Sequence, residues 1–335
     1  MFNFGRNSEK ILKNFFTEGN TTSVLEQNKI NGKSAERFFA ATLTVSLEAR
    51  IFWASRTEDD SKVDLVSILT HPWINNTVQV IFTQIKSGNS YCEIVNETLK
   101  VKKLKFRDFI NRNHHTLICW TSDDDIPYWF IIKANSRYFK TEYPKHHRIS
   151  PAMRFDITRI LASSTLKNGG KGLAFSCRSS AYDKDSFKQL RKTAKVIYKK
   201  LKLERIDNPL LGEIKFTRLA WRHITRESRL NEYKVASFEI FKILGLIISE
   251  TPTNHYILKS CQKENGDFNY RENEYLLVYD NVRCYDKTNK EYFGTRIYMK
   301  LLEFIEYQND WMNKVNASAK VKRKVIFKSI YYKNT

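Results

Sequence analysis

The stretch VQVIFTQIKSG at residues 78–88 combines an apolar strand with a polar end. Apolar side chains occupy both alternating faces of its first part, which is typical of a central strand in a sheet covered on both sides. Gln84 and Lys86 then project from one face at the carboxyl end, just before Gly88. A strand that only fills a core would not end on two polar side chains, so this end is the first candidate site.

The sequence around this strand predicts a sheet with helices packed on it. Ser34 is a good N-cap for a helix over residues 34–53, and a turn at residues 72–76 joins the two strands of a hairpin. The expected elements follow in the order α, β, β, α, β, β, at residues 34–53, 62–69, 76–88, 101–113, 116–120 and 128–134. This mixture indicates an α/β core.

A buried lysine needs an anionic partner, because an unpaired one loses its proton. The nearest carboxylate by topology belongs to Asp64, in the preceding strand of the hairpin. Glu36 and Glu48, near the two ends of the predicted helix, are further candidates. An Asp64–Lys86 pair that only ties the hairpin together is the structural interpretation of this pattern.

Asp64, followed by Gln84–Ile85–Lys86, resembles the active-site pattern of the PD-(D/E)xK nuclease superfamily. In that superfamily a hairpin supplies an aspartate and then an acidic residue, any residue and a lysine. Glu36 matches a glutamate that an upstream helix often adds. Gln84 departs from the usual acidic residue, although some branches, including methylated-DNA restriction enzymes and relatives of archaeal junction resolvases, carry glutamine there. The resemblance covers about residues 30–140.

The resemblance implies a restriction-endonuclease-like core, a mixed sheet flanked by helices, and metal-dependent hydrolysis of DNA phosphodiester bonds. Mg²⁺ or Mn²⁺ would be bound by Asp64, the Gln84 amide oxygen and the Ile85 carbonyl. Lys86 would help to deprotonate the attacking water or stabilise the developing charge, and Glu36 would complete the catalytic set. Because Gln84 is neutral, a non-catalytic nucleic-acid-binding protein with the same fold remains the alternative.

The net charge of +21 lies mainly in the second part of the chain, since 36 of the 57 lysines and arginines follow residue 150. Such a field attracts polyanions. Nucleic acid, above all double-stranded DNA, is the expected partner. Anionic membrane surfaces and acidic proteins remain open, as does a role of the charge in solubility alone.

Two basic clusters are the candidate nucleic-acid contacts. Residues 185–203 predict a helix with one apolar and one cationic side, and residues 221–229, WRHITRESR, place cations beside a tryptophan. His223 could alternatively be the general base of a metal-independent ribonuclease or toxin. The phosphate contacts are expected from Lys188, Arg191, Lys192, Lys195, Lys199, Arg222, His223 and Arg226.

The whole chain is expected to form two domains. An extension at residues 1–29 precedes a nuclease-like domain at 30–140, a linker at 141–152 and a basic α+β domain at 153–335, in which residues 235–249 and 296–315 are expected to be helical. Five cysteines form no CxxC pair, which fits reduced thiols in a cytoplasmic protein. No apolar run is long enough to span a bilayer. A homodimer is plausible because duplex cleavage needs two sites, and analogy suggests a role in prokaryotic defence.

Overall fold

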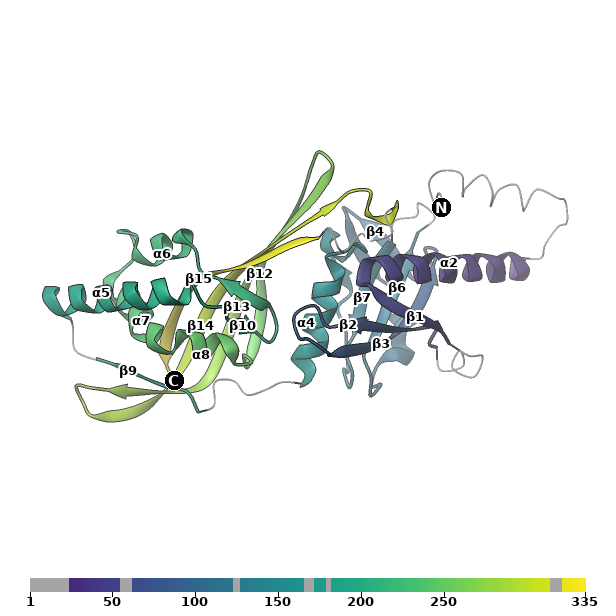
Figure 1. The fold of residues 1–335 in the computed structure, drawn as a ribbon. Helices are drawn as coiled ribbons and strands as arrows, with labels where there is room; N and C mark the ends of the chain where they lie inside the picture. Colours follow the sequence, from purple (N-terminus) through teal and green to yellow (C-terminus); the bar gives the residue numbers. More distant parts are fainter. Residues whose placement is uncertain (1–23, 55–61, 123–126, 166–171, 179–181, 314–320) are drawn as a thin grey trace.

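The structure is a computed structural model that describes residues 24–54, 62–122, 127–165, 172–178, 182–313 and 321–335. Most of the expected N-terminal extension, residues 1–23, lies outside these ranges. The chain forms two lobes, an N-terminal lobe in purple and blue and a C-terminal lobe in green and yellow (Figure 1). Several sheets and helices make up these lobes, so the expected mixed α/β class is confirmed.

A five-stranded sheet forms the centre of the N-terminal lobe, and the predicted strand lies in its middle. Neighbouring strands are antiparallel except for the parallel pair β3 and β6. The predicted hairpin and the later strand pair are both present. In spatial order the strands are β1 (Ala49–Trp53), β2 (Leu65–Thr70), β3 (Val78–Ser87), β6 (Thr116–Thr121) and β7 (Pro127–Ile132).

Different elements cover the two faces of this sheet. Helices α2 (Val24–Leu47) and α4 (Met153–Thr165) pack on the face that carries Ile81 and Ile85. The other face, which carries Ile118 and Trp120, is covered by smaller elements. These are a small sheet of β4 (Cys92–Val95), β5 (Thr98–Val101) and β8 (Glu142–Tyr143), and the 3₁₀ helix η1 (Lys103–Phe109).

Two helix predictions in this lobe are wrong in extent. The helix predicted over residues 34–53 begins earlier, at Val24, and ends at Leu47, after which Glu48 adopts a positive φ of 49° and β1 begins. Pairing of β1 with β2 overrides the helical pattern of its apolar residues. The helix predicted over residues 101–113 is only the 3₁₀ helix η1, because its first part joins strand β5.

The C-terminal lobe contains a seven-stranded sheet with four long strands, β12 to β15. The helix predicted over residues 296–315 is wrong, because residues up to Gln308 belong to β14, which pairs along its length with β13 and β15. The strands are β10 (Asp207–Asn208), β11 (Gly212–Lys215), β15 (Lys322–Asn334), β14 (Glu291–Gln308), β13 (Phe268–Asp286) and β12 (Asn254–Asn265), with β9 (Ala174–Cys177) beside β13.

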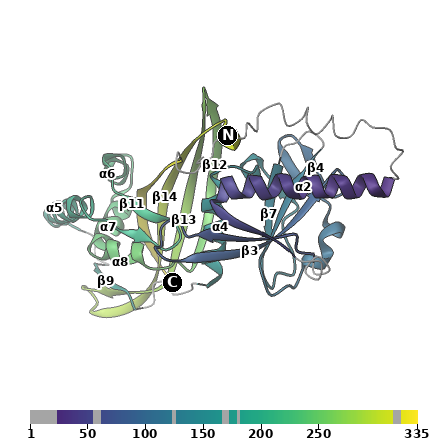
Figure 2. The ribbon, with the colours of Figure 1, turned by 45° about the vertical axis from the view of Figure 1, so that its right-hand side comes forward.

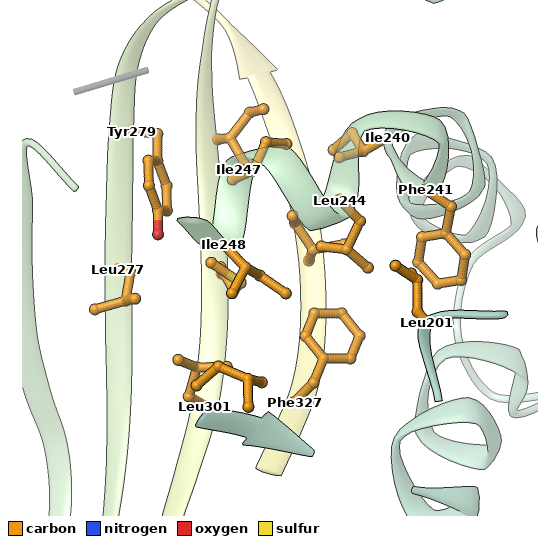
Figure 3. Close-up of a cluster of buried hydrophobic side chains, with 14 of the residues drawn as sticks. Leu201, Ile240, Phe241, Leu244, Ile247, Ile248, Leu277, Tyr279, Leu301 and Phe327 are labelled. Atoms are coloured by element: carbon orange, nitrogen blue, oxygen red, sulfur yellow. The ribbon is translucent and has the colours of Figure 1, made fainter. Parts of the chain in front are cut away.

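Helices cover one face of this sheet and bury a large apolar core. Leu201 and Phe241 from the helices pack against Tyr279, Leu301 and Phe327 from the strands (Figure 3). The single helix predicted over residues 235–249 is interrupted by a 3₁₀ turn, η3. The covering elements are α5 (Lys184–Leu201), α6 (Arg218–Thr225), α7 (Asn231–Ile240), η3 (Phe241–Ile243) and α8 (Leu244–Ser249).

The two lobes are joined by a buried ionic network between α4 and the long strands. Arg159 of α4 donates to Glu303 of β14 at 3.1 Å, and Arg271 of β13 donates to Asp156 of α4 at 2.6 Å. Arg323 of β15 donates to Glu303 at 2.8 Å. Burial raises the pKa of Glu303, but the charges of Arg159, Arg323 and Arg271 outweigh burial and hold it well below its usual value.

Apolar packing reinforces this junction. Ile305 and Tyr307 of β14, together with Trp311, belong to the same core as α2 and the five-stranded sheet. The stretch expected as a linker also contains structure, since it holds β8 and the 3₁₀ helix η2 (Lys145–His147). Figure 2 shows α4 between the sheets of the two lobes. No helix in the described part of the chain is long and apolar enough to cross a membrane.

Candidate active site

The polar end of β3 extends beyond its partner strand β2. The pairing of these strands ends at Leu65 and Thr83, so no β2 residue lies opposite Gln84. Asp64, the residue before β2, occupies this position. Its carboxylate accepts hydrogen bonds from Gln84 Nε2 at 2.6 Å and from the backbone N–H of Ile85 at 2.5 Å. The fold therefore brings together the three residues predicted as metal ligands.

Gln84 carries the unusual feature of this site. Its side chain is only 3% exposed. Its amide nitrogen bonds to Asp64, whereas its Oε1 is buried and has no hydrogen-bond partner among the described residues. A buried acceptor without a partner is destabilising by about 1–3 kcal/mol and calls for an explanation. A ligand that approaches this oxygen, such as a cation, would satisfy it.

The donor set fits a divalent cation of the Mg²⁺ type, with little negative charge. Mg²⁺ prefers oxygen ligands and often takes one or two carboxylates together with substrate phosphates. Here Asp64 supplies one carboxylate and Gln84 one neutral oxygen. Within the described ranges, no group of three or more His, Cys, Asp or Glu side chains is placed to hold a metal. Further negative charge would have to come from the substrate or from Glu36.

Lys86 lies at the rim of the same site. It alternates onto the face that carries Gln84, and its Nζ lies 5.4 Å from the centre of the Tyr91 ring. The strand ends at the next residue, Ser87, and is followed by Gly88, which has a φ of 81° and accepts a hydrogen bond from Trp120 Nε1 at 2.9 Å. Lys86 is half-buried, so its ammonium contacts the Tyr91 ring and keeps access to solvent.

Glu36 lies on α2 beside the buried Ala35. Because α2 packs on the face of Ile81 and Ile85, the helix and the polar pair at the end of β3 belong to different faces of the sheet. A role of Glu36 in the ligand shell remains a prediction.

Electrostatics near Asp64 also exclude one alternative nucleophile. Cys119, in β6 beside Ile85, is completely buried. Burial first, and then the charge of Asp64, raise the pKa of the Cys119 thiol well above its usual value. The thiol therefore stays protonated and unreactive.

The cations predicted on α5 are all solvent-exposed. Lys188, Arg191, Lys192, Lys195 and Lys199 are on the outside of this helix. Its other side buries Ala194, Tyr198 and Leu201, and Asp183 caps its N-terminus by accepting from Ser186 N at 2.7 Å. The amphipathic pattern is therefore confirmed, and the cationic side can reach a polyanion.

On α6, Arg222 and Arg226 are exposed, whereas His223 is half-buried. Burial lowers the pKa of His223, and the nearby charges of Arg226, Lys328, Arg229 and Lys300 lower it further. The imidazole is therefore neutral at pH 7. Its surroundings include one carboxylate, Glu274, whose own pKa is influenced by His223.

The sequence analysis did not identify one further set of basic residues as a candidate binding site. Lys259, Lys263, Lys322 and Lys324 lie on the long strands and line one hollow of 440 Å³. Lys322 and Lys324 are two residues apart, and this spacing in the sequence indicates that both side chains lie on one face of a strand. That Lys259 and Lys263 of β12 lie near them follows only from the strand order of the folded sheet.

No family model matches the chain, and no curated protein or solved structure matches it either. Membership of a nuclease superfamily therefore stays an expectation from the residues, and function has to be argued from the geometry of this chain.

Proposed function

We propose that the chain is a metal-dependent endonuclease that hydrolyses DNA, with its chemistry at the carboxyl end of β3. The observation that carries this proposal is the unpartnered, buried Oε1 of Gln84 beside the Asp64 carboxylate. The hairpin β2–β3 followed by the pair β6–β7 supports it, because this is the order that the resemblance implies. The excess of exposed cations supports a polyanionic substrate.

In this proposal, metal binding, charge stabilisation and DNA binding would fall to different residues. Asp64, Gln84 and the peptide of Ile85 would hold Mg²⁺ or Mn²⁺, which neutralises phosphate charge and activates water when bound. Lys86 would bring a positive charge to the scissile phosphate, where negative charge develops in the transition state. Cations of α5 and α6 would bind the DNA backbone and set its position.

Cleavage of supercoiled plasmid DNA with Mg²⁺ or Mn²⁺ tests this proposal. We expect wild type to cut, EDTA to abolish cutting, and Lys86→Ala to lower the rate at least a hundredfold while it still binds DNA. Lys103→Ala, an exposed lysine of the same lobe, is the matched control and should cut like wild type. Cutting by Lys86→Ala at the wild-type rate would contradict the assignment.

A non-catalytic DNA-binding protein is the second candidate, because the described residues offer few carboxylates for a metal. It predicts that DNA binds and no divalent ion changes the thermal unfolding temperature. The ribonuclease alternative at His223 predicts instead RNA cleavage that survives EDTA and disappears in His223→Ala.

A further inference from the structure

In the part of the chain that the structure describes, one face of the C-terminal sheet carries no helix. Alternate residues of β13 and β14 point to α4 or to helices α5–α8, and the residues between them point the other way. We call this second side of β12–β15 the outer face. Its basic residues are Lys259, Lys263, Lys300, Lys322, Lys324 and Lys328.

The outer face is hollowed near the end that lies closest to the N-terminal lobe. The hollow has a volume of 440 Å³, and four neighbouring strands contribute to its lining. Two aromatic side chains line it, Tyr270 of β13, which is 37% exposed, and Phe304 of β14. This volume suits one small ligand or an unstacked base, and is far too small for a duplex.

Two carboxylates on this face, Glu274 and Glu306, are paired with lysines, whereas the exposed Glu272 lines the hollow without a lysine partner among the described residues. Glu274 pairs with Lys328 at 2.9 Å and with Lys300 at 3.7 Å, and Glu306 pairs with Lys322 at 2.8 Å. Lys259, Lys263 and Lys324 are exposed, and none of them has a carboxylate partner among the described residues. Three cations around the hollow are therefore available to an anionic ligand.

The basic cluster of α6 continues the outer face. His223 lies close enough to Lys300 and Lys328 for their charges to lower its pKa, so this helix borders the paired lysines. Tyr298 and Tyr331, stacked with ring centres 5.1 Å apart, occupy paired positions next to Lys300. Cations and aromatic rings thus follow one another from α6 across the strands to the hollow.

We infer that the outer face binds a single-stranded segment of nucleic acid, with phosphates on its lysines and a base in the hollow against Phe304 and Tyr270. Aromatic rings between cations stack bases of any sequence. This inference extends the proposed function by a strand-binding surface, but strand binding itself needs neither metal nor cleavage.

The test is binding of a fluorescein-labelled twelve-residue oligothymidylate to the full chain in EDTA, followed by anisotropy at several salt concentrations. In the hollow variant, Lys259→Gln, Lys263→Gln and Lys324→Gln are combined. The control variant combines Lys103→Gln, Lys105→Gln and Lys133→Gln, which remove the same charge from exposed positions of the N-terminal lobe. We expect at least tenfold weaker binding for the hollow variant and a salt slope smaller by about 2, since each lost phosphate contact contributes about 0.7. The control should stay within twofold of wild type.

Phe304→Leu provides a second, uncharged test. It should weaken oligothymidylate binding about fivefold or more and leave the salt slope unchanged, because stacking is lost and no ion is involved. Equal binding by the hollow and control variants would overturn the inference, as would an equal loss of duplex and single-strand binding. Plasmid cleavage in Mg²⁺ is scored separately, so a chain that binds the oligonucleotide and cuts nothing would refute the nuclease proposal alone.

Discussion

The Gln84 amide has a hydrogen-bond partner at its nitrogen and none at its oxygen among the described residues. The nitrogen donates to the Asp64 carboxylate, and the oxygen is buried. A side chain that merely closed the hairpin would satisfy both ends of its amide. One carboxylate and one amide oxygen are the two groups that the proposed metal site would use.

Replacement of Gln84 by glutamate separates a metal site from a structural pair. Without metal, Gln84→Glu places two carboxylates in contact, and we expect the free energy of unfolding to fall by about 1–3 kcal/mol. With Mn²⁺, the added charge should give a larger rise in thermal unfolding temperature than in wild type. Differential scanning fluorimetry with EDTA and with Mn²⁺ measures both effects. An equal Mn²⁺ response of the two proteins would count against a cation here.

His147 predicts how stability depends on pH. Its Nδ1 lies 3.0 Å from the carbonyl oxygen of Trp129, and burial lowers its pKa to about 3. In the unfolded chain His147 has a pKa of 6.5, so below this pH the unfolded chain binds a proton that the folded chain does not bind. The free energy of unfolding therefore falls as the pH drops from 6.5 towards 3. Each such histidine adds a slope of up to about 1.4 kcal/mol per pH unit, and His146 and His255, both lowered to about 4, add to it. Urea unfolding at several pH values should show a smaller slope in His147→Gln, and an unchanged slope would contradict this.

The sequence predicted the surroundings of a residue only where its contact partners are close to it in the chain or in the same hairpin. Alternation alone placed Gln84 and Lys86 on one face of β3, and the hairpin made Asp64 their neighbour. The histidines at 146 and 147 looked solvated within a charged, proline-bounded stretch. Their burial comes from Trp129 and Tyr143, whose rings lie against His147.

Among the elements, strands β3, β6 and β7 were predicted as strands, whereas β14 was predicted as a helix. The run RIYMKLLEFIEYQ at residues 296–308 has apolar residues at helical and at strand spacings. These residues form a strand and not a helix because β13 and β15 pair with β14 on its two sides. That pairing is nonlocal and lies beyond any single-segment pattern. Helix α5 was predictable because its cationic and apolar sides follow one period of 3.6.

The cationic side of α5 makes a prediction at the same scale. Lys188→Gln, Lys192→Gln and Lys199→Gln together should weaken duplex binding at least tenfold and lower its salt slope by between 2 and 3, since each phosphate contact contributes about 0.9 on duplex DNA. Circular dichroism should stay unchanged, because none of the three side chains is buried. The same substitutions at Lys103, Lys105 and Lys133 are the control. Equal effects of both sets would mean that only net charge matters.

In the whole molecule, the network around Glu303 ties the two lobes into one unit. Glu303 is fully buried and accepts from arginines of α4 and β15. We expect Glu303→Gln to lower the free energy of unfolding by about 3–5 kcal/mol, because it leaves buried arginines without their counter-charge. Lys62→Gln breaks the exposed pair with Asp108 and should change it by less than about 1 kcal/mol. Urea unfolding measures both, and equal losses would contradict a central role of the network.

The location of Ile305, Tyr307 and Trp311 has a consequence for the order in which the protein matures. These residues complete the core of the N-terminal lobe, although about 170 residues separate them from the end of β7, the last strand of its five-stranded sheet (305 − 132 = 173). During synthesis the ribosome releases this sheet long before its last packing partners exist. The proposed catalytic strand therefore reaches its final packing only when β14 has been made, and until then the N-terminal lobe lacks part of its core.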